Sequence, residues 1–167
     1  MVSVIIHANE DIDPLADTLA MLVSGSVFGL VSEVILWSEN HSNVLKTVAD
    51  DTGCRYLSRS DLGTAIMSAK SKWLLFLVPG ARLLDQWREI LSRYIENETR
   101  PAQFRLIGTK KVTKLRRFLG LNRQLEGGLL ITKNQIASIY NNQTPLHKYL
   151  RKLNPVTLPI QILDSSQ

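Results

Sequence analysis

The sequence predicts an α/β domain in which a mostly parallel central sheet is covered by helices on both faces. Strand-like and helix-like segments alternate four times over the first 95 residues, an order that is typical of parallel strands joined by crossover helices. The strand-like segments are short and continuously apolar, rather than alternating between apolar and polar residues. Such strands are buried on both sides, as in a sheet that carries helices on each face.

The first 98 residues contain four expected strands and four expected helices. The strands are expected at residues 2–6, 33–37, 54–57 and 73–78, and the helices from residue 14 and at residues 41–51, 61–69 and 84–95. Asp13 is the expected N-cap of the first helix, with Pro14 at its first position, and Ser42 is the expected cap of the second. Pro79 and Gly80 are expected to end the fourth strand as a turn.

The pattern is looser after residue 98. Strands are expected at residues 103–107, 128–131 and 156–163, and helices at residues 112–119, 135–140 and 146–150. A chain of 167 residues has the length of one domain, and such a domain buries about two thirds of its unfolded surface. We therefore expect residues 1–167 to form a single domain.

The two parts of the chain differ in charge. Residues 1–98 carry 8 Lys or Arg and 13 Asp or Glu, whereas residues 99–167 carry 12 and 2. Eight cations and no acid lie between residues 99 and 125. This asymmetry predicts that the basic part faces a phosphate, an anionic lipid surface, nucleic acid or an acidic partner, and a plain solvated face is the alternative.

Five cations of this stretch are candidate anion-binding residues. They are Lys110, Lys111, Lys114, Arg116 and Arg117. Arginine pairs with phosphate oxygens in a two-pronged geometry, so such residues could take the place of a metal ion beside a diphosphate. Only Phe104 and Phe118 accompany them as aromatic residues, a thin platform for base stacking that gives no strong nucleic-acid signal.

Composition also bears on location and cofactors. No apolar run approaches the roughly 20 residues that cross a bilayer, and no basic leader precedes the acidic residues 10–13. We therefore expect a cytoplasmic protein, with the basic face as a site for peripheral attachment to the inner membrane surface. The single Cys54 excludes a disulfide within the chain, no cofactor is expected, and the sequence does not indicate an oligomeric state.

Four segments, in their order and spacing, resemble family 2 glycosyltransferases of the GT-A fold. Val-Ser-Val-Ile-Ile at residues 2–6, followed by Asn9-Glu10, resembles the family's first strand and its Asn-Glu pair. Residues 33–40 resemble the second strand and its acidic turn, and residues 72–77 the strand that delivers the Asp-x-Asp metal motif. Residues 126–133 resemble a late acidic-Gly segment, and the match spans roughly residues 2–133.

The resemblance implies sugar transfer from a nucleotide sugar to an acceptor hydroxyl. It implies that residues 1–98 form a nucleotide-binding half and residues 99–167 a basic, acceptor-side half. Because ligands bind at the carboxyl ends of parallel strands, the residues after the expected strands should converge on the nucleotide sugar. These are His7, Asn9, Glu10, Ser38, Glu39, Gly80 and Arg82. A plain polar-loop role is the alternative for Asn9, Glu10 and Glu39, and a satisfied loop histidine is the alternative for His7.

The departures from the family pattern concern the metal. Val78, Pro79 and Gly80 stand where the Asp-x-Asp motif is expected, and none of them has a side-chain oxygen to bind a divalent cation. Ser38 and Glu39 replace the paired aspartates after the second strand. We therefore expect no metal site, and an active enzyme would need fixed cations to stabilise the departing diphosphate.

Glu126 matches the family position of the catalytic base, which deprotonates the acceptor hydroxyl. Its basic surroundings in the sequence favour the ionised carboxylate that a base requires, and Gly127 and Gly128 would allow a substrate or backbone to approach closely. An ion pair with Arg123 is the structural alternative. At the level of the whole chain, the alternatives are a non-catalytic pseudoenzyme acting as a binding module, and a basic-surface protein that binds anionic lipid or nucleic acid.

Overall fold

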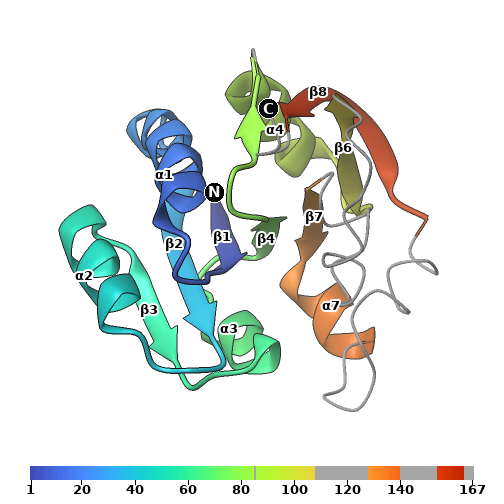
Figure 1. The fold of residues 1–167 in the computed structure, drawn as a ribbon. Coiled ribbons are helices and arrows are strands. Elements are labelled where there is room, and N and C mark those ends of the chain that lie inside the picture. The colour runs from blue at the N-terminus through green and yellow to red at the C-terminus, as the bar shows by residue number, and fades with distance from the viewer. Residues whose placement is uncertain (85, 108–127, 140–153, 164–167) are drawn as a thin grey trace.

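A computed structural model of the chain describes residues 1–84, 86–107, 128–139 and 154–163 (Figure 1). The predicted alternation of strands and helices is confirmed over the first part. In chain order, the elements are β1 (Val2–His7), α1 (Ile12–Val27), β2 (Val31–Ser38), α2 (Asn43–Thr52), β3 (Arg55–Ser58), α3 (Leu62–Ser68), β4 (Trp73–Leu77), β5 (Arg82–Leu83), α4 (Trp87–Asn97), β6 (Ala102–Ile107), β7 (Leu129–Thr132), α7 (Lys133–Ile139) and β8 (Val156–Leu163).

The described strands form one sheet in the order β3-β2-β1-β4-β7-β6-β8-β5. The pairings of β1 with β2, of β1 with β4 and of β2 with β3 are parallel, as predicted. Beyond β4 the sheet becomes mixed, because β7 runs antiparallel to both β4 and β6. The strand β8 then pairs in parallel with β6 and antiparallel with the short β5 at the edge.

Helices cover both faces of the sheet, which confirms the predicted fold class (Figure 1). On one face, α1, α2 and α4 enclose a core that includes Leu15, Leu45 and Leu91. On the other face, α3 and α7 pack against a second core that includes Ile66 and Ile136. Successive residues of a strand point to opposite faces, so the apolar strands supply side chains to both cores.

Of the two predicted helix caps, one is confirmed, and a third helix has a cap that was not predicted. Ser42 caps α2 as predicted, because its hydroxyl accepts a hydrogen bond from the Leu45 backbone N–H. The side chain of Asp61 caps α3 in the same way, accepting from the Thr64 N–H at 2.7 Å. The start predicted for α1 was wrong by two residues: the helix begins at Ile12 after Asp11, whose side chain makes no cap bond.

The looser second part also holds expected elements. The strand at residues 156–163 has the predicted bounds, the strand predicted at 103–107 begins one residue earlier, and the strand predicted at 128–131 is shifted by one residue. The two-residue β5 was not predicted, since it is too short to show a hydrophobic pattern and depends on pairing with β8. The helices expected at 112–119 and 146–150 lie outside the described residues. Within the described ranges, none of the helices has the length and hydrophobicity to span a membrane.

A buried carboxylate joins three strands and the α3–β4 connection. Glu33, on β2, accepts hydrogen bonds from the hydroxyl of Ser3 at 2.7 Å and from the Lys70 backbone N–H at 2.6 Å. Its other oxygen forms an ion pair with Arg55 on β3 at 2.6 Å, and Arg55 also donates to the Ser68 carbonyl. The Glu33 side chain is only 7% exposed, so these donors replace nearly all of its water.

The hydrogen bonds of Glu33 decide the direction of its pKa shift. Burial alone would raise the pKa of Glu33, but the hydrogen bonds from Lys70, Ser3 and Arg55, with the charge of Arg55, outweigh it and hold the pKa below the ordinary 4.5. A carboxylate with a lowered pKa stabilises the fold above its unfolded-state pKa, and that stability is lost as the pH falls through the folded-state value.

We therefore expect Glu33→Gln to lower the free energy of unfolding at pH 7 by about 1–3 kcal/mol, the usual loss for a buried, charge-assisted hydrogen bond. The difference from the parent should begin to shrink as the pH falls below about 4.5, the ordinary pKa of the carboxylate in the unfolded chain, and should be lost only below the lower pKa of the folded chain, where the parent is protonated as well. Urea unfolding at pH 7 and at acid pH measures both quantities. A difference that is the same at both pH values would contradict this role.

Candidate functional site

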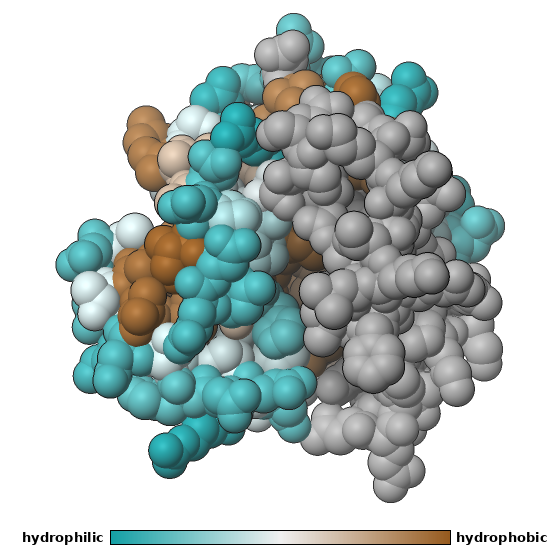
Figure 2. Space-filling view, in the orientation of Figure 1, coloured by the Kyte–Doolittle hydropathy of each residue, from teal (hydrophilic) through white to brown (hydrophobic). Residues whose placement is uncertain are grey.

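The carboxyl ends of β1, β2, β3 and β4 lie along one edge of the sheet, here called the carboxyl edge. His7 is paired with Trp37, Ser38 with Ser58, and Ile6 with Leu77. The loops that follow these strands therefore begin side by side, as expected for parallel neighbours. In Figure 2, mainly hydrophilic side chains lie along the bottom of the view, where β2 and β3 end.

The loop after β1 carries His7, Asn9 and Glu10. Asn9 and Glu10 are exposed, whereas His7 is half-buried and stacks on Trp37 with ring centroids 4.2 Å apart and an interplanar angle of 19°. The Ala8 backbone N–H donates to the Trp37 carbonyl at 2.9 Å, which continues the strand pairing past His7. The planar rings of His7 and Trp37 are therefore stacked at the ends of β1 and β2.

The loop after β2 is held by a hydroxyl group from β3. The hydroxyl of Tyr56 lies 2.7 Å from the Ser38 Oγ and accepts a hydrogen bond from the Ser42 backbone N–H at 3.1 Å. Ser38, which is buried, also donates to the Asn40 carbonyl at 2.6 Å. Both residues that flank Glu39 are thus fixed, while Glu39 itself is exposed.

The loop after β4 is a closed turn where the resemblance would place a metal motif. The Ala81 N–H donates to the Val78 carbonyl at 3.1 Å, and Gly80 has a φ of 87°. Pro at the second position and a positive φ at the third are the features of a type II turn. These residues offer no side-chain oxygen and do not fit a divalent cation. Among the described residues, no group of three or more His, Cys, Asp or Glu is placed to hold a metal.

Thr18, on α1, forms hydrogen bonds to the backbone of this turn. Its hydroxyl accepts a hydrogen bond from the Gly80 N–H at 2.8 Å and donates to the Ala81 carbonyl at 3.1 Å. The Gly80 N–H also donates to the Pro14 carbonyl at 2.7 Å. Thr18 is fully buried, so its hydroxyl replaces the water that the turn would otherwise bind.

The side chain of Arg82, which follows this turn, contacts α1. Its guanidinium forms an ion pair with Asp17, and both side chains are about half exposed. The cation predicted to meet the nucleotide sugar is therefore paired with an acid of its own chain. Exposed pairs of this kind contribute little to stability.

The acceptor-side candidates lie mostly outside the described residues. These are the base candidate Glu126 and the cations Lys110, Lys111, Lys114, Arg116 and Arg117. Gly128 is described and has a φ of 63°; a Cβ added there would lie 2.7 Å from the ring of Phe104. The space that a Gly128 side chain would occupy is therefore filled by Phe104, and Gly127 lies outside the described residues.

Three residues of this region were missed by sequence reasoning. Trp37 and Tyr56 lay within expected strands and Thr18 within the expected first helix, and none of the three was singled out. In the sequence, a lone Thr or Tyr has no periodicity that reveals a hydrogen-bond role. Trp37 offered a signal, because it directly precedes the Ser38-Glu39 pair at the end of a strand.

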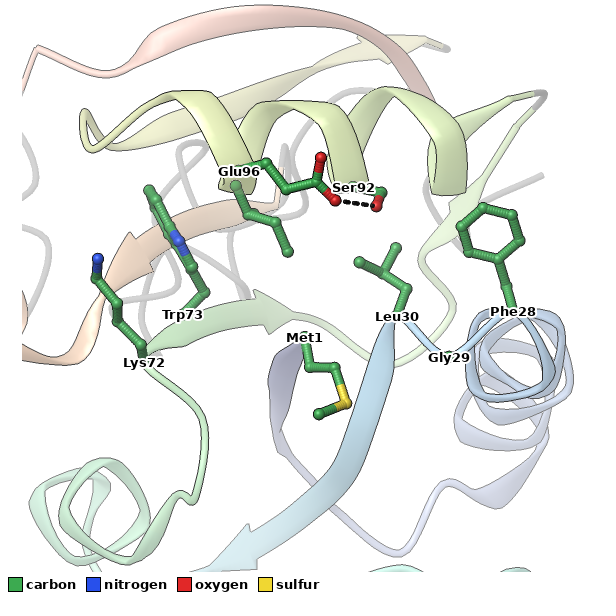
Figure 3. Close-up of a pocket in the computed structure, with 9 residues that line it drawn as sticks. Met1, Phe28, Gly29, Leu30, Lys72, Trp73, Ser92 and Glu96 are labelled. Carbon is green, nitrogen blue, oxygen red and sulfur yellow. Dashed lines mark hydrogen bonds between the residues drawn. The ribbon is translucent and has the colours of Figure 1, made fainter.

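Two pockets are lined by described residues. One, of about 420 Å³, lies at the opposite end of the parallel strands, between the start of β4 and α4 (Figure 3). Its walls include Leu30, Trp73 and Ile95, and Glu96 accepts a hydrogen bond from Ser92 at its rim. The other, of about 650 Å³, runs along α3 toward α7.

No protein-family model matches the sequence, and no curated protein matches it. Solved structures do match. Mannosyl-3-phosphoglycerate synthase from Rubrobacter xylanophilus superposes with a TM-score of 0.67 at 13% identity, over 100% of this chain and 67% of that one. The fold is of the GT-A type.

Two further neighbours have the same architecture. Glucosyl-3-phosphoglycerate synthase from Mycobacterium tuberculosis, in complex with phosphoglyceric acid, has a TM-score of 0.65 at 15% identity, over 100% of this chain and 72% of that one. A mannosyltransferase from Pyrobaculum calidifontis, in complex with GDP-Man and Mn²⁺, has a TM-score of 0.67 at 10% identity, over 99% and 57%. Two of the neighbours are sugar-phosphoglycerate synthases and one is a mannosyltransferase by name, so the GT-A resemblance drawn from the sequence is confirmed at the level of the fold.

The pKa of His7 provides a test of the carboxyl edge. Burial lowers the pKa of His7 below the ordinary 6.5, and the negative charge of Glu39 opposes part of this shift. The unfolded chain therefore takes up the proton first as the pH falls. The stability contributed by neutral His7 is present above about pH 6.5 and is lost below it.

We expect an NMR titration of the His7 ring to give a pKa below 6.5, and Glu39→Gln to lower that pKa further because it removes the opposing charge. Glu96→Gln, on the remote α4, is the matched control and should leave His7 unchanged. A His7 that titrates above 6.5, or that does not respond to Glu39→Gln, would refute this electrostatic coupling.

Proposed function

We propose that this chain binds a nucleotide sugar at the carboxyl edge without a divalent cation, and transfers the sugar to an acceptor hydroxyl. The observation that supports this most is the pairing of a GT-A fold with an exposed, polar carboxyl edge and a closed, metal-incompatible turn at Val78–Ala81. Ligands of open parallel sheets bind at the carboxyl ends of the strands, which supports this edge as the site, and the residues at that edge decide what chemistry is available.

The carboxyl edge divides into contact residues and supporting residues in this proposal. Asn9, Glu10 and Glu39 are exposed and have the acceptors and donors that sugar or ribose hydroxyls require. The stacked rings of His7 and Trp37 offer a planar surface of the kind that a nucleobase packs against. The buried Ser38 stabilises the loop that carries Glu39 through its hydrogen bond to the Asn40 carbonyl.

In the transfer step, Glu126 acts as the base. Its carboxylate takes the proton of the acceptor hydroxyl as that oxygen bonds to the sugar carbon, and the bond from this carbon to the diphosphate oxygen breaks. The departing diphosphate gains negative charge, which positive side chains must stabilise when no metal is present.

A second candidate function is nucleotide-sugar binding without transfer. The turn at Val78–Ala81 favours it, because losing a metal at a departing diphosphate removes several kcal/mol of transition-state stabilisation. Binding without turnover would make the chain a pseudoenzyme that serves as a binding module. The two candidates share the same ligand and differ only in whether product forms.

Isothermal titration with UDP-glucose and GDP-mannose, the donor types in the neighbours' complexes, tests the shared claim. We expect one of them to bind with the same affinity in EDTA and in Mn²⁺, because the turn offers no metal ligand. The variant Gly80→Asp, which returns one carboxylate, should not create metal dependence, since the φ of 87° and the bonds to Thr18 and Pro14 hold the backbone.

Binding that requires Mn²⁺ in the parent chain would overturn the metal-free proposal. Failure of both donors to bind would overturn the nucleotide-sugar proposal itself. Where a donor binds, hydrolysis or transfer of its sugar distinguishes the two candidates, and Glu126→Gln should abolish product formation while leaving donor affinity unchanged.

A further inference from the structure

Arg59 lies at the carboxyl edge, directly after β3. Ser58 is paired with Ser38 at the ends of β3 and β2, and the Ser60 backbone N–H donates to the Ser38 carbonyl at 3.1 Å. Arg59 therefore stands between two residues that are tied to the end of β2, and Glu39 is the next residue of that strand's loop. Neighbouring strands lie about 5 Å apart, so the backbones of Arg59 and Glu39 are close neighbours.

Three other cations that the structure describes around the parallel strands have partners. Arg55 is paired with Glu33, and Arg82 with Asp17. The Nζ of Lys133 donates to the carbonyls of Met67 and Ala69 at 2.8 and 2.9 Å, which satisfies the end of α3.

Arg59 differs from these cations. Its side chain is exposed and forms no hydrogen bond or ion pair with any residue in the described ranges. The neighbouring Glu39 is exposed as well, and no ion pair links the two. An exposed arginine and an exposed glutamate thus directly follow the ends of two adjacent strands.

The backbone of Arg59 is held in an uncommon conformation. Its φ is 50°, in the left-handed region that residues other than glycine rarely adopt. The Ser60 bond to β2 and the Asp61 cap of α3 enclose this position on its carboxyl side. Asparagine or glycine would adopt this left-handed backbone conformation with less strain than arginine.

We infer that Arg59 binds the phosphate groups of a nucleoside diphosphate at the carboxyl edge, beside the ribose contact of Glu39, in place of a divalent cation. The inference rests on the proposed function, which names the ligand class but no residue among the described ones for the phosphates. A nucleotide presents hydroxyl donors on its ribose and charged acceptors on its phosphates. These match a carboxylate and a guanidinium respectively, and guanidinium binds phosphate oxygens through two parallel N–H donors.

The test compares nucleotides with their nucleosides in EDTA, using UDP against uridine and GDP against guanosine in NMR or calorimetric titrations. Arg59→Asn removes the charge with a residue that tolerates the left-handed backbone, and thermal unfolding verifies that the variant is folded. Arg59→Lys keeps the charge without the two-pronged geometry. Arg93→Asn, an exposed arginine on α4, is the matched control.

We expect Arg59→Asn to weaken diphosphate binding about tenfold, the usual effect of losing one charge-assisted contact, with nucleoside binding unchanged. Arg59→Lys should lose less, and Arg93→Asn nothing. Diphosphate binding within twofold of the parent in Arg59→Asn would overturn the role of Arg59 while leaving the proposed function standing. If neither diphosphate nor nucleoside binds to the parent chain, both fail together.

Discussion

The central strand β1 is paired in parallel with β2 on one side and β4 on the other, and this double pairing decides where the loops of the candidate site lie. Its register brings the ends of the three strands to one edge, and the pairing of β2 with β3 adds a fourth. Val4, Ile5 and Ile6 are almost fully buried between the two cores, so the register cannot slip by one residue without exchanging the faces of the whole strand. The positions of Asn9, Glu39, Arg59 and Gly80 all follow from this constraint.

Along the carboxyl edge, the loops differ in which side chains are held by hydrogen bonds and which are exposed to a ligand. The hydroxyl of Tyr56 is hydrogen-bonded to Ser38, and the hydroxyl of Thr18 is hydrogen-bonded to the backbone of the turn at Gly80. These contacts fix the backbone and leave the exposed side chains of Asn9, Glu10, Glu39 and Arg59 as groups that can meet a ligand. At the position that the sequence resemblance assigns to a metal, the turn after β4 is instead hydrogen-bonded to Thr18 on α1. A nucleotide bound here would meet protein cations in place of a metal ion, which makes its binding sensitive to salt and independent of manganese.

Much of the fold was predictable because apolar runs and capping residues act locally. The strand at residues 73–77 and the Ser42 cap are recognisable from the sequence alone, since each depends on residues within a few positions of itself. The antiparallel β7 was not predictable, because its direction depends on where the chain re-enters the sheet after residues 108–127. For the site, the strand ends gave Asn9, Glu10 and Glu39 as candidates at one edge. The pairing of Arg82 with Asp17 and the free state of Arg59 depend on contacts far apart in sequence, which no local pattern encodes.

The central claim is that the carboxyl edge binds a nucleoside diphosphate without a metal ion. A crystal structure of the chain grown with UDP or GDP in the presence of EDTA tests it most directly. The account predicts the base beside the rings of His7 and Trp37, the ribose hydroxyls at Glu39, and the phosphates within hydrogen-bond distance of the Arg59 guanidinium. Density for the nucleotide in the groove between β4 and α4, or phosphates directed at the Val78–Ala81 turn with Arg59 facing solvent, would contradict it.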